Sequence, residues 1–262
     1  MDTVRVKEGE VLVLGPEDYA VLDEDDFGAP GLVAAEVVGP FVRLQAVGPL
    51  IMVHDAVFDP HRGIGHHPHR FNERLFYILE GAVDHDDALN DIQGHMGTGD
   101  VGRLTEGQRG MLHKEWNDTP GRARAFILVY RTDPVPPRAS FAVLRDGEAP
   151  RYPEAPGVET KELVGPRSPL RVHGDLRWFG DSRMEEGAGI EQELGSSEAA
   201  LLFALEGTVE FGGGPSLGPG QAAVVGPGDG RIAVSAREGA RLLRAVVGAG
   251  QGLVFGEPWA RR

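Results

Sequence analysis

Turn residues cut this chain into short pieces, with a break roughly every eight to twelve residues. Gly39-Pro40 and Gly48-Pro49, for example, separate the apolar runs 32–38, 41–47 and 50–58. The 262 residues include 38 glycines and 19 prolines, which long helices tolerate poorly and which turns between strands need. The spacing predicts an all-β chain, built as a sandwich or a small barrel.

Two pairs of potential metal ligands stand out, His67 with His69 and His113 with Glu115. Residues i and i+2 of a strand point to the same face, so each pair would present both side chains to one side. On facing strands the two pairs offer three imidazoles and one carboxylate to a single point, which suits a divalent first-row metal. Crowding these groups without a metal would be costly, so we prefer a metal site to a hydrogen-bonded histidine cluster.

A proline-dense segment, 133–137, divides the chain, because proline cannot donate to the ladder of an interior strand. We therefore expect two domains, residues 1–134 and residues 135–262. A second proline-rich stretch, 148–169, is interpreted as an extended connector.

Short motifs of the first half return in the second. Leu-Glu-Gly at 79–81 recurs at 205–207, and the glycine turn at 97–100 recurs at 218–221. Two matches in the same order suggest two copies of one β-unit. The ligand pairs do not recur: the offset from His67 and His69, for example, leads to Glu193 and Gly195. We therefore expect one metal ion per chain, held in the first domain, and a second domain without metal ligands.

Charge and composition exclude several partners. The net charge is −14 and no basic block exists, so the cationic stripe that direct binding of DNA or RNA requires is missing. There is no cysteine, which leaves only nitrogen and oxygen ligands for a metal. Residues 1–5 are charged without an apolar signal core, and no run approaches the ~18 apolar residues of a membrane span. We expect a cytoplasmic monomer with no membrane contact.

The histidine and glycine motifs, in this order, resemble the two motifs of the cupins, including Asn117 four residues after His113. The likeness is closer to the pirin family. It is carried by the segments 67–70, 77–81, 99–101 and 112–115 and by His85, within a stretch from about Gln45 to Tyr130.

This resemblance implies a bicupin, in which two β-barrels of the cupin type face one another and the N-terminal barrel holds a single metal ion, usually iron. Carried over by position, the ligands are His67, His69, His113 and Glu115. Bacterial pirin-like proteins are associated with dioxygenase cleavage of the flavonol quercetin, and eukaryotic ones with transcriptional regulation through protein partners. The chain departs from the usual family residues at 71–73, at His66 and at Lys114, which affects the expected pocket rim.

The carboxylate ligand has two candidates. Ordinary cupins use a glutamate shortly after the His-x-His pair, which here is Glu73, at the head of the next expected strand. Glu115 shares the i, i+2 phase of His113 and therefore its face, so we favour Glu115 as the ligand. Glu73 would then hydrogen-bond a ligand or accept a proton. Glu115 and Glu73 are accordingly the predicted catalytic residues.

The remaining histidines are assigned no chemistry. His61 and His66 fall in an expected glycine-rich loop, 61–66, where exposure is the usual outcome. The other four lack a partner at ligand spacing; they are His54, His85, His95 and His173.

Two functions follow as hypotheses. The first is a metal-dependent dioxygenase that uses O₂ on a small aromatic substrate of the flavonol or catechol type, as the resemblance to quercetin 2,3-dioxygenase implies. Fe(II), favoured by the resemblance, and Mn(II), Ni(II), Cu(II) and Zn(II) all suit the donors. The second is a non-catalytic, metal-binding regulatory protein that acts through a protein partner. A sugar or small-acid cupin enzyme, with activity independent of O₂, is a third interpretation.

Overall fold

Strands account for nearly all regular structure in the computed structural model, which describes residues 11–228, 230–250 and 252–260. The segment 1–5 considered above lies outside these residues. The prediction of an all-β chain is confirmed. A single turn of α-helix, α1 (Glu24–Phe27), and 3₁₀ turns at Pro16–Asp18 and Asp146–Glu148 are the helical elements of the described ranges. None of these helices is long and apolar enough to cross a membrane.

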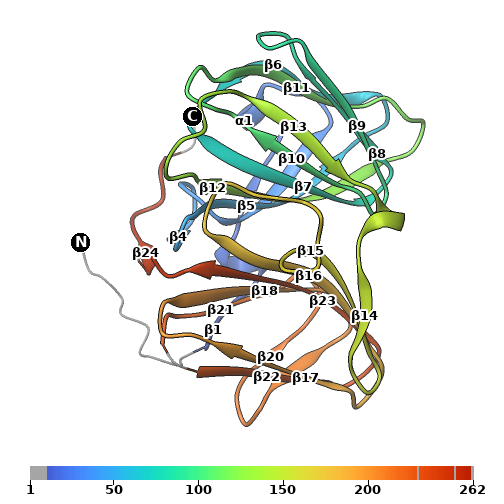
Figure 1. Ribbon diagram of the computed structural model, residues 1–262, viewed down its shortest axis with the longest axis vertical. Coiled ribbons are helices and arrows are strands. Elements are labelled where there is room, and N and C mark those ends of the chain that lie inside the picture. The colour runs from blue at the N-terminus through green and yellow to red at the C-terminus, as the bar shows by residue number, and fades with distance from the viewer. Residues whose placement is uncertain (1–10, 229, 251, 261–262) are drawn as a thin grey trace.

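The upper unit in Figure 1 consists of two facing sheets. The larger has the strand order β13-β10-β7-β12-β5-β3-β2, with β4 and β24 attached beside β5, and the smaller has the order β6-β11-β8-β9. The bounds of these strands are β2 (Ala20–Leu22), β3 (Leu32–Val38), β4 (Leu44–Val47), β5 (Leu50–Phe58), β6 (Arg62–His69), β7 (Asn72–Glu80), β8 (Ala82–Asp87), β9 (Ile92–Gly97), β10 (Val101–Thr105), β11 (Met111–Asn117), β12 (Ala123–Arg131), β13 (Ser140–Leu144) and β24 (Leu253–Phe255).

The lower unit repeats this plan, with one sheet of order β1-β21-β18-β23-β16-β15-β14 and a smaller one of order β17-β22-β19-β20. Its strands are β1 (Val11–Leu14), β14 (Arg151–Ala155), β15 (Val158–Val164), β16 (Leu176–Met184), β17 (Gly189–Leu194), β18 (Glu198–Glu206), β19 (Val209–Phe211), β20 (Ser216–Leu217), β21 (Ala222–Val225), β22 (Gly230–Ala236) and β23 (Ala240–Gly248).

The two larger sheets pack against each other and form the main core. Phe126 of β12 and Phe203 of β18 meet there with ring centroids 4.9 Å apart. Strands also cross between the units, since β1 pairs with β21 of the lower unit and β13 pairs with β10 of the upper one. The domain boundary between residues 134 and 135 stays a prediction.

The bicupin architecture is confirmed, but its barrels are not closed. In each unit the two sheets face one another without ladder hydrogen bonds among the described residues that would join them around the circumference. Facing sheets in a sandwich stand about 10 Å apart and are held by side chains rather than by backbone pairing. Each unit is therefore a two-sheet sandwich of the cupin type, one of the two forms that the spacing of the turns predicted.

The internal repeat is visible in the turns. Asp100 accepts a hydrogen bond from the backbone of Gly97 at 3.0 Å, and Gln221 accepts one from Gly218 at 2.8 Å. A further pair unites the copies: Glu36 opens the sequence Glu-Val-Val-Gly-Pro, and Glu162 opens Glu-Leu-Val-Gly-Pro at the same offset as the Leu-Glu-Gly motifs. Both glutamates lie near the end of matching strands, β3 and β15.

Two expectations about irregular segments were wrong. Residues 62–66 form part of strand β6, because Gly63 lets the backbone of β11 approach closely. A Cβ at Gly63 would lie 2.2 Å from the carbonyl oxygen of Glu115. The stretch 148–169 contains the hairpin β14–β15 rather than a connector. Pro153 is accommodated because β14 is the edge strand of its sheet.

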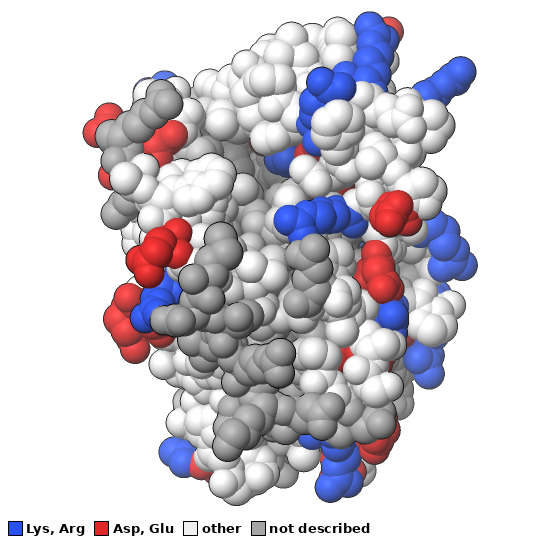
Figure 2. Space-filling view, turned by 90° about the vertical axis from the view of Figure 1, so that its left-hand side faces the viewer, with Lys and Arg blue, Asp and Glu red and all other residues white. Residues whose placement is uncertain are grey.

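On the face shown in Figure 2, lysine and arginine side chains predominate toward the upper right, and aspartate and glutamate side chains lie mainly along the left edge and in a group at the right. Uncharged surface lies between these groups.

Candidate metal centre

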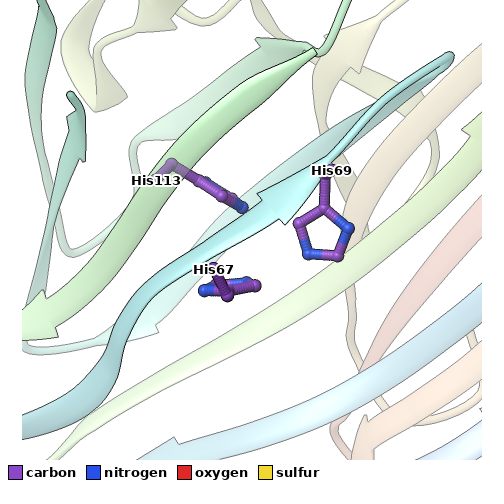
Figure 3. Close-up of side chains that lie close together, drawn as sticks. All are labelled: His67, His69 and His113. Atoms are coloured by element: carbon purple, nitrogen blue, oxygen red, sulfur yellow. The ribbon is translucent and has the colours of Figure 1, made fainter. Parts of the chain in front are cut away.

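Strands β6 and β11 bring the two predicted ligand pairs together. His67 lies directly opposite His113 in the antiparallel ladder, and a register shift separates this pair from Glu115, which stands opposite Ile64. Because of this shift, Glu115 and Ile64 point to the same face of the sheet as His113 and His67. Figure 3 shows the three imidazoles, two from β6 and one from β11, converging on a common space.

The imidazoles of His67, His69 and His113 are close enough to share an ion. One nitrogen from each lies within 4.8 Å of the others. Metal bonds to imidazole nitrogen of about 2.1 Å place opposite ligand atoms about 4.2 Å apart, so small side-chain rotations would close the site. A second group, His85, His113 and Glu115, meets the same distance limit and shares His113 with the first.

Glu115 adds the carboxylate. Its Oε1 lies 2.8 Å from His113 Nδ1 and its Oε2 lies 3.9 Å from His67 Nε2, and the side chain is almost entirely buried. Burial alone would raise the pKa of the Glu115 carboxyl, but the imidazoles of His113 and His67, with Arg74, lower that pKa well below its usual range. The group is therefore ionised at neutral pH.

His67 and His69 are held in the neutral form that a metal requires. Burial lowers the pKa of His67, and burial together with the guanidinium of Arg74 lowers the pKa of His69 to about 2. His67 Nδ1 donates to the carbonyl oxygen of Gly65 at 2.8 Å, which leaves the lone pair on Nε2. Neutral imidazoles with a fixed tautomer are ready ligands.

Unpaired polar atoms mark the centre of the cluster. Among the described residues, His113 Nε2 and His85 Nε2 are buried side-chain atoms without a hydrogen-bond partner. Buried polar atoms are normally satisfied, so such a group requires an explanation. Imidazole nitrogen and carboxylate oxygen are donors that a divalent first-row metal accepts, and the residues present therefore fit such an ion.

A cavity of about 560 Å³ adjoins the cluster. His67, His69 and Glu115 lie on one wall, on the smaller sheet, and the larger sheet forms the opposite wall. Most of the lining is apolar and partly aromatic; it includes Phe27, Met52, Phe58, Phe76, Ile127 and Trp259. The arrangement suits a flat, largely apolar ligand with one end at the imidazoles.

Glu73 lies away from this cavity. Its carboxylate is fully buried and accepts hydrogen bonds from Thr105, from Tyr130 and from the backbone and ring of His173. The next residue, Arg74, lines the cavity, and successive strand residues point to opposite faces. The structure does not bring Glu73 to His67, His69 or His113, and its role as a hydrogen-bond partner of a ligand or as a proton acceptor stays a prediction.

The comparisons with known proteins agree with the geometry. A family model described as Pirin matches residues 25–128. Pirin-like protein 2 of Arabidopsis thaliana is 30% identical over 227 residues, which cover 82% of this chain and 68% of that protein. This chain belongs to the pirin family. The putative quercetin 2,3-dioxygenase PA2418 of Pseudomonas aeruginosa is 27% identical over 224 residues, covering 79% of this chain and 74% of the relative.

A solved structure extends the match. The bacterial pirin YhhW from Escherichia coli, in complex with nickel(II), superposes with a TM-score of 0.73 and 16% identity. The alignment covers 91% of this chain and 99% of that one. The fold of this pirin is thus that of a protein whose structure holds a metal ion.

The sequence did not reveal that His85 lies beside His113 and Glu115 in the candidate metal centre. It lies opposite Glu115 on the neighbouring strand β8, and its Nδ1 is 3.4 Å from His113 Nδ1. Burial lowers the pKa of His85 to about 4. Ligand spacing along one strand does not reveal His85, because His85 meets His113 across two neighbouring strands. Its alternation with the apolar Val83 was the available signal.

Two more residues of this cavity were not anticipated. Arg74 is buried and its Nη2 donates to Glu106 at 2.7 Å, and His54 forms a buried pair with Glu36. Neither has a motif that reveals it. His61 and His66 are exposed, as expected, and His66 lies 3.1 Å from Asp86.

Proposed function

We propose that this pirin is a metal-dependent dioxygenase that acts on an aromatic substrate of the flavonol or catechol type, in the manner of a quercetin 2,3-dioxygenase. One observation carries the proposal: neutral imidazoles and an ionised carboxylate, some of their atoms buried without partners, adjoin an apolar cavity. The name of the Pseudomonas relative supports the same chemistry.

His67, His69 and His113 would hold the ion through imidazole nitrogen, and Glu115 through its carboxylate. Fe(II) is the proposed ion, and Mn(II), Ni(II), Cu(II) and Zn(II) suit the same donors. When bound, such an ion would supply a Lewis acid for a substrate hydroxyl, and the redox-active ions among them, unlike Zn(II), could also supply redox chemistry toward O₂.

The side chains contribute charge, orientation and exclusion of water. Glu115 is ionised, so its carboxylate can accept the proton of a substrate hydroxyl. The guanidinium of Arg74 favours the neutral form of the His69 imidazole. Phe58 and Phe76 offer flat apolar surface against which an aromatic ring can pack.

The test combines metal analysis with turnover. Protein purified without added metal is analysed for bound elements, reloaded with each divalent ion in turn, and assayed for O₂ uptake with quercetin. We expect about one ion per chain and O₂ uptake that depends on it. His113→Ala should lose both the ion and O₂ uptake. His66→Ala, which removes an exposed histidine next to His67, is the matched control and should keep both.

Other results would redirect the assignment. A retained ion without O₂ uptake on flavonols or catechols, together with a co-purifying protein, would favour a metal-binding regulatory protein. Turnover of a sugar or small acid without O₂ would favour the third class of cupin. Full metal content in His113→Ala would remove the proposed site.

A further inference from the structure

The cavity carries a second polar group on the wall opposite the imidazole cluster. His54 of β5 stands in register with Glu36 of β3, and His54 Nε2 lies 3.0 Å from Glu36 Oε2. The two side chains are 8% and 0% exposed. Both line the same cavity as His67 and Glu115. The function proposed above makes no use of this pair.

Glu36 fixes which nitrogen of His54 is free. The other carboxylate oxygen, Oε1, accepts a hydrogen bond from the backbone of Phe41 at 2.7 Å, so Glu36 acts as an acceptor on both sides. His54 therefore donates from Nε2, and in the neutral ring Nδ1 is left as an acceptor. No described residue hydrogen-bonds to Nδ1, and it is not among the fully buried unpaired atoms. Its lone pair is open to the cavity.

The second unit shows what the fold alone needs at this position. Glu162, the counterpart of Glu36, accepts a hydrogen bond from the backbone of Arg167 at 2.6 Å, just as Glu36 does from Phe41. Its other donors are the backbone of Ser168 at 3.3 Å, the guanidinium of Arg167 at 3.4 Å and Trp178 Nε1 at 3.3 Å. An indole can only donate, whereas an imidazole that donates on one side can accept on the other. Both units thus hold a glutamate between a backbone N–H and the N–H of a ring, an arrangement called here the glutamate clamp. In the upper unit, which contains the cavity, the ring also has a nitrogen that can accept a hydrogen bond.

We infer that His54, oriented by Glu36, is a second anchor in the cavity and accepts a hydrogen bond from a hydroxyl of the bound ligand. The ligand is then an aromatic molecule with a metal-binding group at one end and a separate hydroxyl that reaches the larger sheet. The metal-binding end of this description rests on the proposed function. The hydroxyl end rests on His54 and Glu36 alone.

The experiment isolates the hydroxyl end by using metal-free protein. Dissociation constants are measured for 4-phenylphenol and for biphenyl, which differ only by the hydroxyl, in the wild type and in His54→Leu. Comparing the ratio of the two dissociation constants between wild type and variant cancels the different hydration of the two ligands. We expect the preference for the phenol to fall about tenfold in His54→Leu, the effect of one hydrogen bond in a buried site.

Two further variants guard against misfolding. His54→Leu leaves a carboxylate oxygen of Glu36 unpaired, so the double variant E36Q/H54L is measured beside it; its amide oxygen still accepts from Phe41. The matched control is Glu162→Gln, which alters the equivalent clamp of the second unit and should keep the wild-type ratio. Circular dichroism confirms the fold of each variant.

The outcomes separate this inference from the proposed function. An equal ligand ratio in wild type and His54→Leu would overturn the anchor, whatever the flavonol activity. Loss of bound metal in His54→Leu would also overturn it, because the anchor acts on the opposite wall from the cluster. A collapsed ratio in a protein that neither binds nor turns over quercetin would support the anchor and reject the flavonol assignment alone.

Discussion

Replacing Glu73 by glutamine distinguishes a structural carboxylate from a catalytic one. The Glu73 carboxylate accepts four hydrogen bonds, at 2.5 Å from Thr105, 2.8 Å from Tyr130, and 2.8 and 2.6 Å from the backbone and ring of His173. His173 belongs to the segment before β16, so the cluster ties the two units together. Glutamine has the same shape, but only one of its two terminal atoms accepts.

The expected cost is about 2 kcal/mol. The Thr105 hydroxyl and the His173 ring can turn to accept from the new amide, so no donor need stay unpaired. What is lost is the charge of the acceptor, and hydrogen bonds to charged groups contribute about 1.5–3 kcal/mol against about 1 for neutral ones. For a chain of this size, 2 kcal/mol corresponds to a fall of about 4–8 °C in the thermal midpoint.

The assay is thermal unfolding followed by elemental analysis of the folded variant. We expect a lower midpoint and unchanged metal content. Glu159→Gln, at an exposed glutamate of β15, is the control and should change neither quantity. A Glu73→Gln protein that loses its metal while keeping the wild-type midpoint would refute the reasoning and return Glu73 to the site.

Two further predictions concern the cluster itself. Removing the metal should lower the thermal midpoint, because His113 Nε2 would be left buried and unpaired. Adding the ion at about 100 times its dissociation constant should restore about 2.7 kcal/mol, as a titration in a thermal-shift assay would show. Gly63→Ala should cost about 1–3 kcal/mol and weaken metal binding, because its Cβ would meet the Glu115 carbonyl, whereas Gly65→Ala, with open space at its Cβ, should do neither; equal unfolding and metal-binding curves for the two variants would contradict this.

Much of the fold could be predicted from the sequence, because a turn is determined by the few residues that form it. Gly39-Pro40 and Gly48-Pro49 interrupt apolar runs, and β3 and β5 lie where those runs predicted them. The segments 61–66 and 148–169 were misjudged for one reason. Glycine and proline were taken as signs of loops, yet Gly63 serves a close strand approach and Pro153 an edge strand.

The site was only partly accessible from sequence. His67, His69, His113 and Glu115 could be proposed as a group because spacing along a strand determines which face a side chain occupies. His85 and the pair His54–Glu36 depend on which strands become neighbours, and strand order is a long-range property. The face of Glu73 depends on where β7 begins, and a shift of one residue reverses it.

The second unit shows how a sandwich of this type closes its interior without a ligand. Strand β12 pairs Phe126 with Tyr77, and β23 pairs Leu243 with Phe203, the repeat counterpart of Tyr77. Ile127, which lines the cavity, therefore corresponds to Arg244.

Arg244 is buried and reaches across to the smaller sheet, where it donates to Gln192 at 2.7 Å, and its guanidinium lies 4.7 Å from the Trp178 ring. The larger-sheet wall of the lower unit thus supplies its own cation and ring to the interior. In the upper unit the matching residue is Ile127, whose shorter, apolar side chain leaves room beside the imidazoles. Since the two units share a plan and differ in what fills them, the upper cavity is a feature of its residues rather than of the fold, which is what a binding site requires.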